Sequence, residues 1–260
     1  MNEMNPSAEE KNSLSEVQND KIKRLEEIYA EFIKLSKPRG TDISFSDLYM
    51  QDQLGWDTYI KYYFLTQGLR RKLFVLTAFN TRSDRSKNTY SSIYENKIRF
   101  IKEQSISIWK KSSAIPSLSH GMDEKASELM LDLSWYDIVT HRMILGMELE
   151  QNRKREDIRL KDILFDFYKL LYINSELKIM VSFPWQHQVD NLIKSMKDII
   201  SNVSADDDYY LIINISEDMN RGREKQRKDI NYEISGFILN NLRGVLLLEK
   251  CICSCLWKNR

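Results

Sequence analysis

The sequence predicts an all-α protein, a helical bundle of about five helices preceded by a smaller helical N-terminal region. The 260 residues include only 8 glycines and 4 prolines, which are few turn-forming residues for a fold of many strands. Apolar residues recur at helical spacing in several long segments. One of these segments, residues 157–180, is apolar over most of its circumference, as expected of a helix with neighbours on several sides.

The stretch 157–180 is predicted to be the central helix of the bundle. Its apolar residues follow the i, i+3, i+4, i+7 spacing of a helix face, at Leu160, Ile163, Leu164, Phe167, Tyr168, Leu170 and Leu171. Asp162, Asp166 and Lys169 form a narrow polar stripe, and Asp157 is a suitable N-cap. We therefore expect the part of this helix up to Ile173 to be largely buried.

The composition predicts a folded, soluble, intracellular protein. Hydrophobic residues make up 42% of the chain and aromatic residues 11%, which is too much for a disordered protein. Charged residues make up 30% but nearly cancel, to a net charge of +1, so no bulk field attracts nucleic acid or a membrane surface. The N-terminus lacks the apolar core of a signal peptide, and no 18-residue apolar run predicts a membrane span.

The N-terminal part of the chain is predicted to contain a disordered tail at 1–13, a helical region at 14–80 and a linker at 81–92. The helical region begins with an amphipathic helix that ends before Pro38. A second segment, dense in aromatic residues and leucine, is divided by Gly68 into two helices. The linker is rich in serine, asparagine and charged residues, a composition typical of loops.

Residues 93–257 are predicted to form the C-terminal helical bundle. Besides the central stretch, helical periodicity covers residues 93–111, 123–155, 185–201 and 229–257. Ser182 and Pro184 resemble a helix start, with serine as the cap and proline in the first turn. Residues 209–215 are too short for a core helix and are a candidate for an extended segment.

The three cysteines, Cys251, Cys253 and Cys255, favour a reducing compartment. They are odd in number and too clustered for a disulfide framework, and the C-x-C-x-C spacing does not match ordinary zinc sites. We interpret them as packing residues in a helix, with palmitoylation as the alternative.

No residue pattern predicts catalysis, a metal site or a cofactor. His120, His141 and His187 lie far apart in the sequence, without an HExxH motif or a carboxylate pair at ligand spacing. Gly222 and Gly244 stand alone rather than in a phosphate-binding loop. The sequence thus predicts that the protein is not an enzyme.

A basic segment at 219–228 is the predicted contact with RNA or with an acidic partner. It carries five positive charges, on Arg221, Arg223, Lys225, Arg227 and Lys228, against one negative charge. Such clustering suits the neutralisation of phosphates. The alternative is a solvated connector between two helices.

Three parts of the chain together resemble the pre-mRNA-splicing factor 18 family. Residues 24–35, RLEEIYAEFIKL, are similar to the family's splicing-factor motif at Leu25, Glu31, Ile33 and Leu35. The order and spacing of the helices after residue 92 resemble the family's five-helix bundle. Residues 221–225, RGREK, and the segment after them resemble its last loop and helix. The family's Trp-Pro-Ile-Gly-Val loop is absent.

The resemblance implies a non-catalytic, nuclear component of the spliceosome. Such a factor assists the second transesterification of mRNA splicing, in which the exons are ligated and the 3′ splice site is docked. The implied partners are spliceosomal proteins, including a zinc-knuckle second-step factor, and RNA at the inter-helix loop. Leu25, Glu31, Ile33 and Leu35 would form a docking motif. The alternatives are an all-helical scaffold or adaptor of another intracellular complex, and a membrane-associated protein with an acylated tail.

Overall fold

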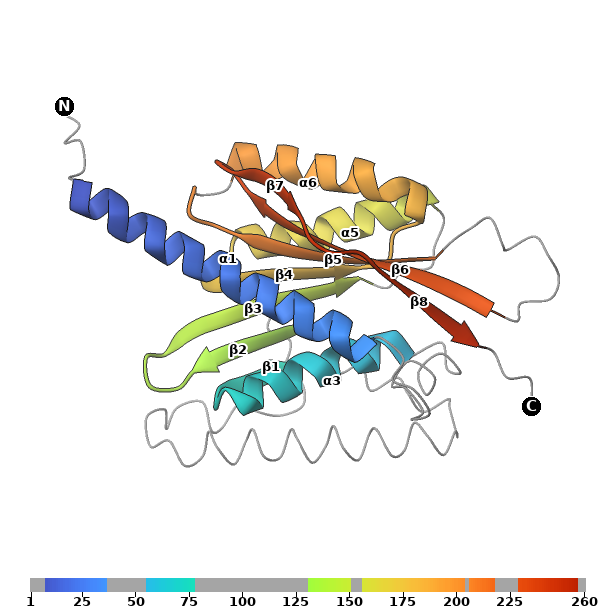
Figure 1. The fold of residues 1–260 in the computed structure, drawn as a ribbon, viewed down its shortest axis with the longest axis horizontal. Helices are drawn as coiled ribbons and strands as arrows, with labels where there is room; N and C mark the ends of the chain where they lie inside the picture. Colours follow the sequence, from blue (N-terminus) through green and yellow to red (C-terminus); the bar gives the residue numbers. More distant parts are fainter. Residues whose placement is uncertain are drawn as a thin grey trace.

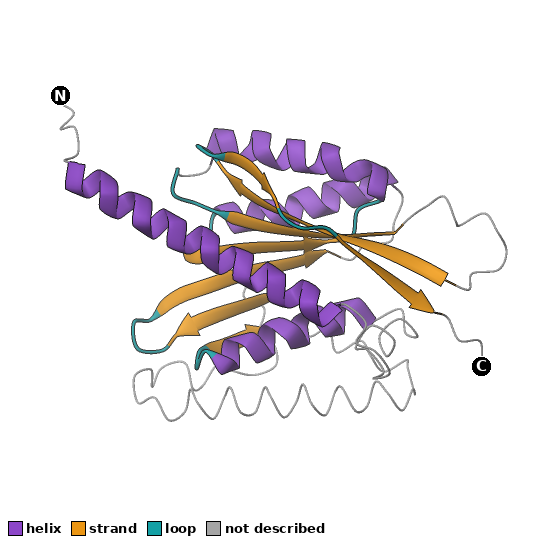
Figure 2. Cartoon of the chain, viewed as in Figure 1, coloured by secondary structure: helices purple, strands orange, loops and turns teal. Residues whose placement is uncertain are grey.

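The protein is a mixed α/β structure, with one eight-stranded sheet covered by helices on both faces (Figures 1 and 2). The computed structural model describes residues 8–36, 55–77, 131–150, 156–203, 206–217 and 229–256. The prediction of an all-α bundle of about five helices is therefore wrong. The predicted linker at 81–92, the helix at 93–111 and the basic segment at 219–228 lie outside the described residues.

The described elements follow one another along the chain as helices α1 and α3, strands β1, β2 and β3, helix α5, strand β4, helix α6 and strands β5 to β8 (Figure 1). Their bounds are α1 Ala8–Ser36, α3 Gly55–Arg70, β1 Phe74–Thr77, β2 Leu133–Asp137, β3 Arg142–Glu150, α5 Glu156–Leu171, β4 Ser175–Ser182, α6 Val189–Val203, β5 Tyr210–Glu217, β6 Asp229–Asn240, β7 Gly244–Leu247 and β8 Cys251–Leu256. A 3-10 turn, Gln186–Gln188, precedes α6.

The centre of the sheet is parallel and its two flanks are antiparallel. The strand order is β1-β2-β3-β4-β5-β6-β7, and β8 also pairs with β6. Strand β4 runs parallel to both β3 and β5, whereas the other pairs are antiparallel. Parallel neighbours require a crossover connection, and α5 and α6 supply the two crossovers. Because β3, β4 and β5 are parallel, their carboxyl ends lie at the same end of the sheet, which we call its carboxyl edge.

Each face of the sheet has its own hydrophobic core. Leu177, Ile179 and Val181 of β4 point toward α1 and α3, while Met180, between them in sequence, points toward α5 and α6. Strands buried on both faces read as continuous apolar runs rather than as an alternating pattern. Such runs have the apolar density of a buried helix, which explains why strands were predicted as helices.

Helix α1 lies across the strands on the first face (Figure 1). Its apolar side packs Leu25, Tyr29 and Phe32 against the sheet, and all three are buried. The Tyr29 hydroxyl donates a 2.7 Å hydrogen bond to the carbonyl of Glu249. The ring lies so close to β6 that a Cβ at Gly236 would be 2.5 Å from it, so only glycine allows this approach.

Helix α5 confirms the predicted helix at the start of the 157–180 stretch but not its burial on all sides. Ile163, Phe167 and Leu170 are fully buried against the sheet and α6, whereas Phe165 and Tyr172 are exposed. The helix covers a sheet and therefore buries only one face. The expectation that the helix is largely buried up to residue 173 was wrong for this reason.

Four predicted helices are wholly or partly strands in the structure. Gly68 does not divide two helices, because α3 continues through it and strand β1, Phe74–Thr77, follows. The hairpin of β2 and β3 occupies the described part of residues 123–155, and β4 replaces the end of the 157–180 helix. Strands β6, β7 and β8 replace the helix predicted at 229–257. The extended interpretation of residues 209–215 is confirmed by β5.

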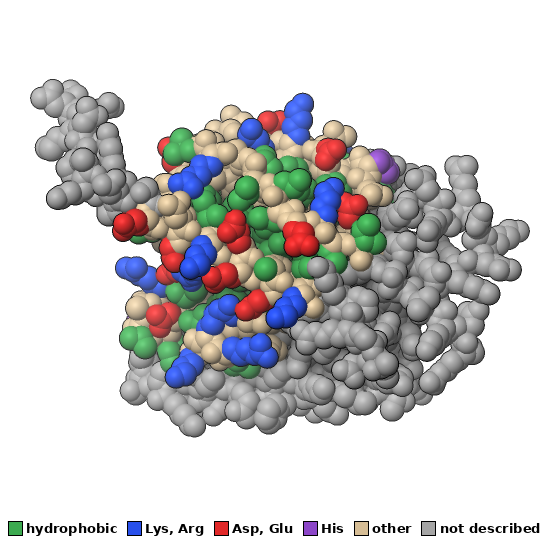
Figure 3. All heavy atoms as spheres, in the orientation of Figure 1, with side chains coloured by type: hydrophobic (Ala, Val, Ile, Leu, Met, Phe, Trp, Pro, Cys, Tyr) green, Lys and Arg blue, Asp and Glu red, His purple; other side chains and the backbone are tan. Residues whose placement is uncertain are grey.

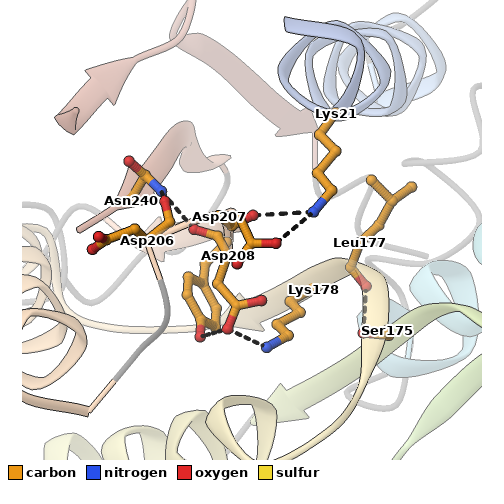
Figure 4. Close-up of polar contacts among 9 residues, drawn as sticks. Lys21, Ser175, Leu177, Lys178, Asp206, Asp207, Asp208 and Asn240 are labelled. Carbon is orange, nitrogen blue, oxygen red and sulfur yellow. Dashed lines mark hydrogen bonds and ion pairs between the residues drawn. The ribbon is translucent and has the colours of Figure 1, made fainter. Parts of the chain in front are cut away.

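The turn before β5 is held by polar contacts with three other elements (Figure 4). The Lys178 ammonium of β4 is buried and lies 2.7 Å from Asp208 Oδ2. Lys21 of α1 donates a 3.1 Å hydrogen bond to the Asp207 carbonyl. The amide of Asn240 donates to the carbonyls of residues 206 and 208, at 2.7 and 2.8 Å. The acidic residues that precede β5, Asp206 to Asp208, thus connect β5 to α1, β4 and β6.

The surface carries both signs of charge. On the face drawn in Figure 3, lysine and arginine are interspersed with aspartate and glutamate. This mixture agrees with the net charge of +1. None of the helices that the structure describes is sufficiently long and apolar to pass through a membrane.

Candidate functional site

Two acidic side chains lie close together at the carboxyl edge of the sheet, where β2 begins and β3 approaches its last residue. The register pairs Leu133 of β2 with Met147 of β3, so Asp132 and Glu148 are next to each other. Asp132 Oδ2 accepts a 2.9 Å hydrogen bond from the backbone N–H of Leu149. Met147 and Leu149 face α1 and α3, so Glu148 projects to the face that α5 covers.

Two lysines and a third carboxylate complete this group. Lys61 Nζ of α3 lies 3.5 Å from Asp132 Oδ1. Lys169 Nζ of α5 lies 3.4 Å from Glu148 Oε2 and 2.6 Å from Asp166 Oδ1. We call Asp132, Glu148, Asp166, Lys61 and Lys169 the carboxylate cluster. Three carboxyl groups face two ammonium groups, so full ionisation leaves one negative charge in excess.

Burial determines how this excess charge is neutralised. The side chain of Glu148 is only 2% exposed. Desolvation, followed by the negative charge of Asp132, raises the pKa of Glu148 to about 9, although Lys169 opposes the shift. Burial alone would lower the pKa of Lys169, but the hydrogen bond to Asp166 and the charge of Glu148 outweigh it and raise this pKa. At neutral pH Glu148 therefore holds a proton and Lys169 stays cationic.

A row of polar side chains continues from this cluster across four strands. The register places Glu150 of β3 beside Ser182 of β4, Ser182 beside Asn214 of β5, and Asn214 beside Ser235 of β6. Met180, Ile212 and Phe237, each two positions from a residue of the row, belong to the core under α5 and α6. Residues two apart in a strand share a face, so the row lies on that face of the sheet. Ser182 Oγ donates a 2.6 Å hydrogen bond to Asn214 Oδ1. We call these four residues the polar row.

Buried polar atoms without a partner are concentrated at this end of the sheet. Over the residues that the structure describes, three buried side-chain atoms have no hydrogen-bond partner: Glu148 Oε1, Asn214 Nδ2 and Ser235 Oγ. All three belong to the carboxylate cluster or the polar row. Each such atom costs about 1–3 kcal/mol, so a native structure keeps it where a ligand or ordered water supplies the partner. The carboxyl edge of the sheet is therefore the candidate site.

The number and type of ligands in the cluster suit a magnesium ion, which needs few protein ligands, better than a metal that is coordinated by protein side chains alone. Within the described ranges, no group of three or more histidine, cysteine, aspartate or glutamate side chains could hold a metal ion. A cation at this edge would have two protein ligands, Asp132 and Glu148, both hard carboxylate oxygens. Mg²⁺ binds in this way, through one or two carboxylates with water and substrate phosphates in the other positions.

We expect Glu148→Gln to remove a pH-dependent part of the stability when divalent cations are chelated. The folded state keeps the Glu148 proton up to about pH 9, whereas the unfolded chain loses it near the ordinary pKa of 4.5. The stabilisation is therefore complete below pH 4.5 and declines as pH rises through about 9, by up to ~1.4 kcal/mol per pH unit. Glutamine resembles the protonated form. Denaturant titrations from pH 6 to 9 should show a smaller decline for the variant, and parallel curves would contradict the assignment.

The predicted docking motif lies in α1. Leu25 and Ile33 are buried in the core between α1 and the sheet, and Glu31 is exposed, 3.9 Å from the Arg71 guanidinium of α3. The side chain of Leu35 lies outside the described residues. So do Arg221, Arg223, Lys225, Arg227 and Lys228. Of the predicted site residues, the three whose side chains are described, Leu25, Glu31 and Ile33, lie on α1 and not at the carboxyl edge of the sheet.

The tail cysteines belong to strand β8 rather than to a helix. Cys251 is buried, which confirms the packing interpretation for this residue. The side chains of Cys253 and Cys255 lie outside the described residues.

The sequence analysis missed the candidate site because it predicted the wrong secondary structure. Asp132 and Glu148 are 16 positions apart, and only a hairpin brings them together. The available signal was the Glu148-Leu149-Glu150 sequence at the end of an apolar run. In a strand, residues i and i+2 share a face, so this spacing gives two carboxylates on one side of a sheet.

Comparisons of the chain with protein-family models, with curated proteins and with solved structures find no match.

Proposed function

We propose that the protein binds one Mg²⁺ or Mn²⁺ ion between Asp132 and Glu148 and hydrolyses phosphodiester bonds. The observation that carries the proposal is the buried Oε1 atom of Glu148, which has no partner although it lies next to a second carboxylate. The protonated Glu148 side chain forms a hydrogen bond with Asp132, whereas the ionised pair is stabilised by a partner that interacts favourably with two carboxylates. A divalent cation meets this requirement, because it replaces the proton and binds both carboxylates.

The substrate class follows from the small number of protein ligands. With two carboxylates from the protein, most positions around the ion are left for water and for substrate oxygens, and phosphate oxygens are the usual substrate ligands of Mg²⁺. The side chains of Asp132 and Lys169 are 24% and 29% exposed, so these two members of the cluster contact solvent.

Each member of the carboxylate cluster has a role in this proposal. Asp132 and Glu148 would hold the ion, and Lys61 Nζ, 3.5 Å from Asp132 Oδ1, orients the Asp132 carboxylate. Lys169 stays protonated beside Asp166, so it stabilises negative charge that develops on the phosphate rather than accepting a proton. The bound ion supplies Lewis-acid polarisation of the phosphate and a more acidic water. Hydrolysis places the hydroxyl group of water on phosphorus, breaks the bond to the leaving oxygen and transfers the remaining proton to that oxygen.

The test is a cleavage assay with purified protein and two kinds of substrate. We expect hydrolysis of bis(p-nitrophenyl) phosphate and of fluorescent oligonucleotides in Mg²⁺ or Mn²⁺, and none in EDTA. Glu148→Gln should reduce the rate by about 10²-fold or more, because the metal supplies several kcal/mol of transition-state stabilisation. Calorimetric titration with Mn²⁺ should show one site in the wild type and a much weaker one in the variant.

The matched control is Glu176→Gln. Glu176 also pairs with a cation, the Arg24 guanidinium at 2.9 Å, but it lies near the start of β4, at the opposite edge of the sheet. This variant should keep its activity and its Mn²⁺ site. Equal activity of Glu148→Gln and the wild type, or full activity in EDTA, would overturn the proposal.

The role in the second step of splicing remains a prediction of the sequence resemblance. Part of that resemblance rests on the order of the helices predicted after residue 92. In the described residues, strands occupy most of those positions. A pulldown from native extract tests this role directly, because small nuclear RNAs and splicing proteins should then be recovered with the chain.

A further inference from the structure

The outer face of α5 carries a line of exposed aromatic rings. Phe165, Tyr168 and Tyr172 are 68%, 40% and 74% exposed. Phe165 and Tyr168 are three positions apart on one side of α5, with Lys161 one turn before them, and Tyr172 is the first residue after the helix ends at Leu171. We call Phe165, Tyr168 and Tyr172 the aromatic stripe.

Packing of the protein does not account for the aromatic stripe. The core side of α5 is formed by other residues, Ile163, Phe167 and Leu170, which are fully buried. The stripe therefore places three large rings in water. Single exposed apolar residues are ordinary, but a continuous line of aromatic rings is typical of a binding surface.

The aromatic stripe begins at the carboxylate cluster. The ammonium of Lys169 lies 5.9 Å from the centre of the Phe165 ring, while the same group is 3.4 Å from Glu148 Oε2. One side chain thus touches both the proposed catalytic site and the first ring. A polymer that occupies the cluster through a phosphate has its neighbouring units within reach of the stripe.

We propose that the aromatic stripe binds single-stranded nucleic acid by stacking its bases beside the phosphodiester that the cluster cleaves. This inference rests on the proposed function, which places a phosphate of the strand at the carboxylate cluster, and it adds that the substrate is single-stranded nucleic acid. Stacking needs a π face, which all three residues have, and bases are free to stack on protein only when they are not already stacked in a duplex. The Phe165 and Tyr168 positions are ~4.5 Å apart along the helix axis, and Tyr172 follows the last helical residue, so successive bases can reach successive rings.

The test measures binding in EDTA, where no cleavage takes place. We expect a fluorescein-labelled dT20 oligonucleotide to raise its anisotropy with wild-type protein, and a duplex of the same length to bind less tightly. The triple variant Phe165→Leu, Tyr168→Leu and Tyr172→Leu keeps an apolar surface but removes the π faces. It should weaken dT20 binding by about tenfold for each ring that stacks a base.

The matched control exchanges one aromatic residue for another. Phe165→Tyr, Tyr168→Phe and Tyr172→Phe together keep every ring and should retain wild-type binding of dT20. Unchanged affinity in the leucine variant would overturn the proposal and would assign the stripe to a protein partner instead. Circular dichroism and melting curves should be the same for all three proteins, because the changed side chains are exposed.

Cleavage kinetics separate this inference from the proposed function. The leucine variant should raise KM for a single-stranded oligonucleotide while it hydrolyses bis(p-nitrophenyl) phosphate at the wild-type rate. If Glu148→Gln leaves cleavage unchanged, the proposed function fails, yet the binding experiment in EDTA still decides the role of the stripe. If dT20 does not bind wild-type protein, the stripe inference fails while the hydrolase proposal stands.

Discussion

Replacing Trp135 by alanine should lower the free energy of unfolding by ~3–5 kcal/mol, the usual cost of removing a buried tryptophan. Trp135 is fully buried in β2, where its ring lies 6.3 Å from that of Phe64 and 5.5 Å from the Arg71 guanidinium. Its indole N–H donates a 3.0 Å hydrogen bond to the Phe64 carbonyl. The alanine variant loses the packing and this hydrogen bond. Urea titration followed by circular dichroism measures the loss.

Two further variants define what Trp135 contributes. Trp135→Phe keeps most of the apolar area and removes the hydrogen bond, so it should cost less than the alanine change. Val139→Ala, in the exposed turn between β2 and β3, should leave the titration within ~0.5 kcal/mol of the wild type. A loss below ~1 kcal/mol in Trp135→Ala would show that this side chain is not part of the core.

Asp208→Asn should destabilise the protein by a similar amount, ~3–5 kcal/mol, because it leaves the buried ammonium of Lys178 without its counter-ion. The two groups are 2.7 Å apart, and Lys178 is buried between β4 and the turn before β5. The Tyr210 ring, 5.1 Å from the ammonium, is then the main favourable partner that remains. Thermal and urea unfolding measure the change.

The neighbouring carboxylate provides the control for this prediction. Asp207 is exposed and 3.8 Å from Lys21, so Asp207→Asn should cost at most ~1 kcal/mol. The double variant Lys178→Met with Asp208→Asn removes both buried charges and should recover much of the loss, because an apolar side chain replaces the unpaired ammonium. Equal effects of the two asparagine variants would show that the Lys178 pair is not buried in solution.

Helices with one apolar side could be predicted from the sequence, whereas the sheet could not. The periodicity in 14–37 and 185–201 corresponds to α1 and α6, and the start of the 157–180 stretch corresponds to α5. Between α5 and β4 the chain has no glycine or proline, only Asn174 as a turn-forming residue. Apolar residues on both sides of that turn therefore read as one continuous helix. Local periodicity does not record which residues pair across strands, and pairing is what defines a sheet.

The candidate site depended on the same missing information. Glu148 and Glu150 lie two apart in the sequence, but their neighbours Asp132, Ser182 and Asn214 come from other strands. Sequence analysis can identify acidic residues, but the register of three strand pairs decides which of them meet. The basic segment at 219–228 was the more visible pattern because clustered charge needs no fold to be recognised.

The position of α1 has a consequence for synthesis of the protein on the ribosome. The helix is made first, but the surfaces it packs on come late: its Tyr29 hydroxyl bonds to residue 249, and Lys21 bonds to residue 207. At 5–20 residues per second, about 10–45 s pass between translation of Tyr29 and translation of its partner. During that interval Phe32 can already contact Tyr63 and Phe64 of α3, but Tyr29 has no β6 to pack against. The nascent chain thus exposes this part of the apolar side of α1 until β6 and the residues after it have emerged, a state in which chaperones recognise their clients.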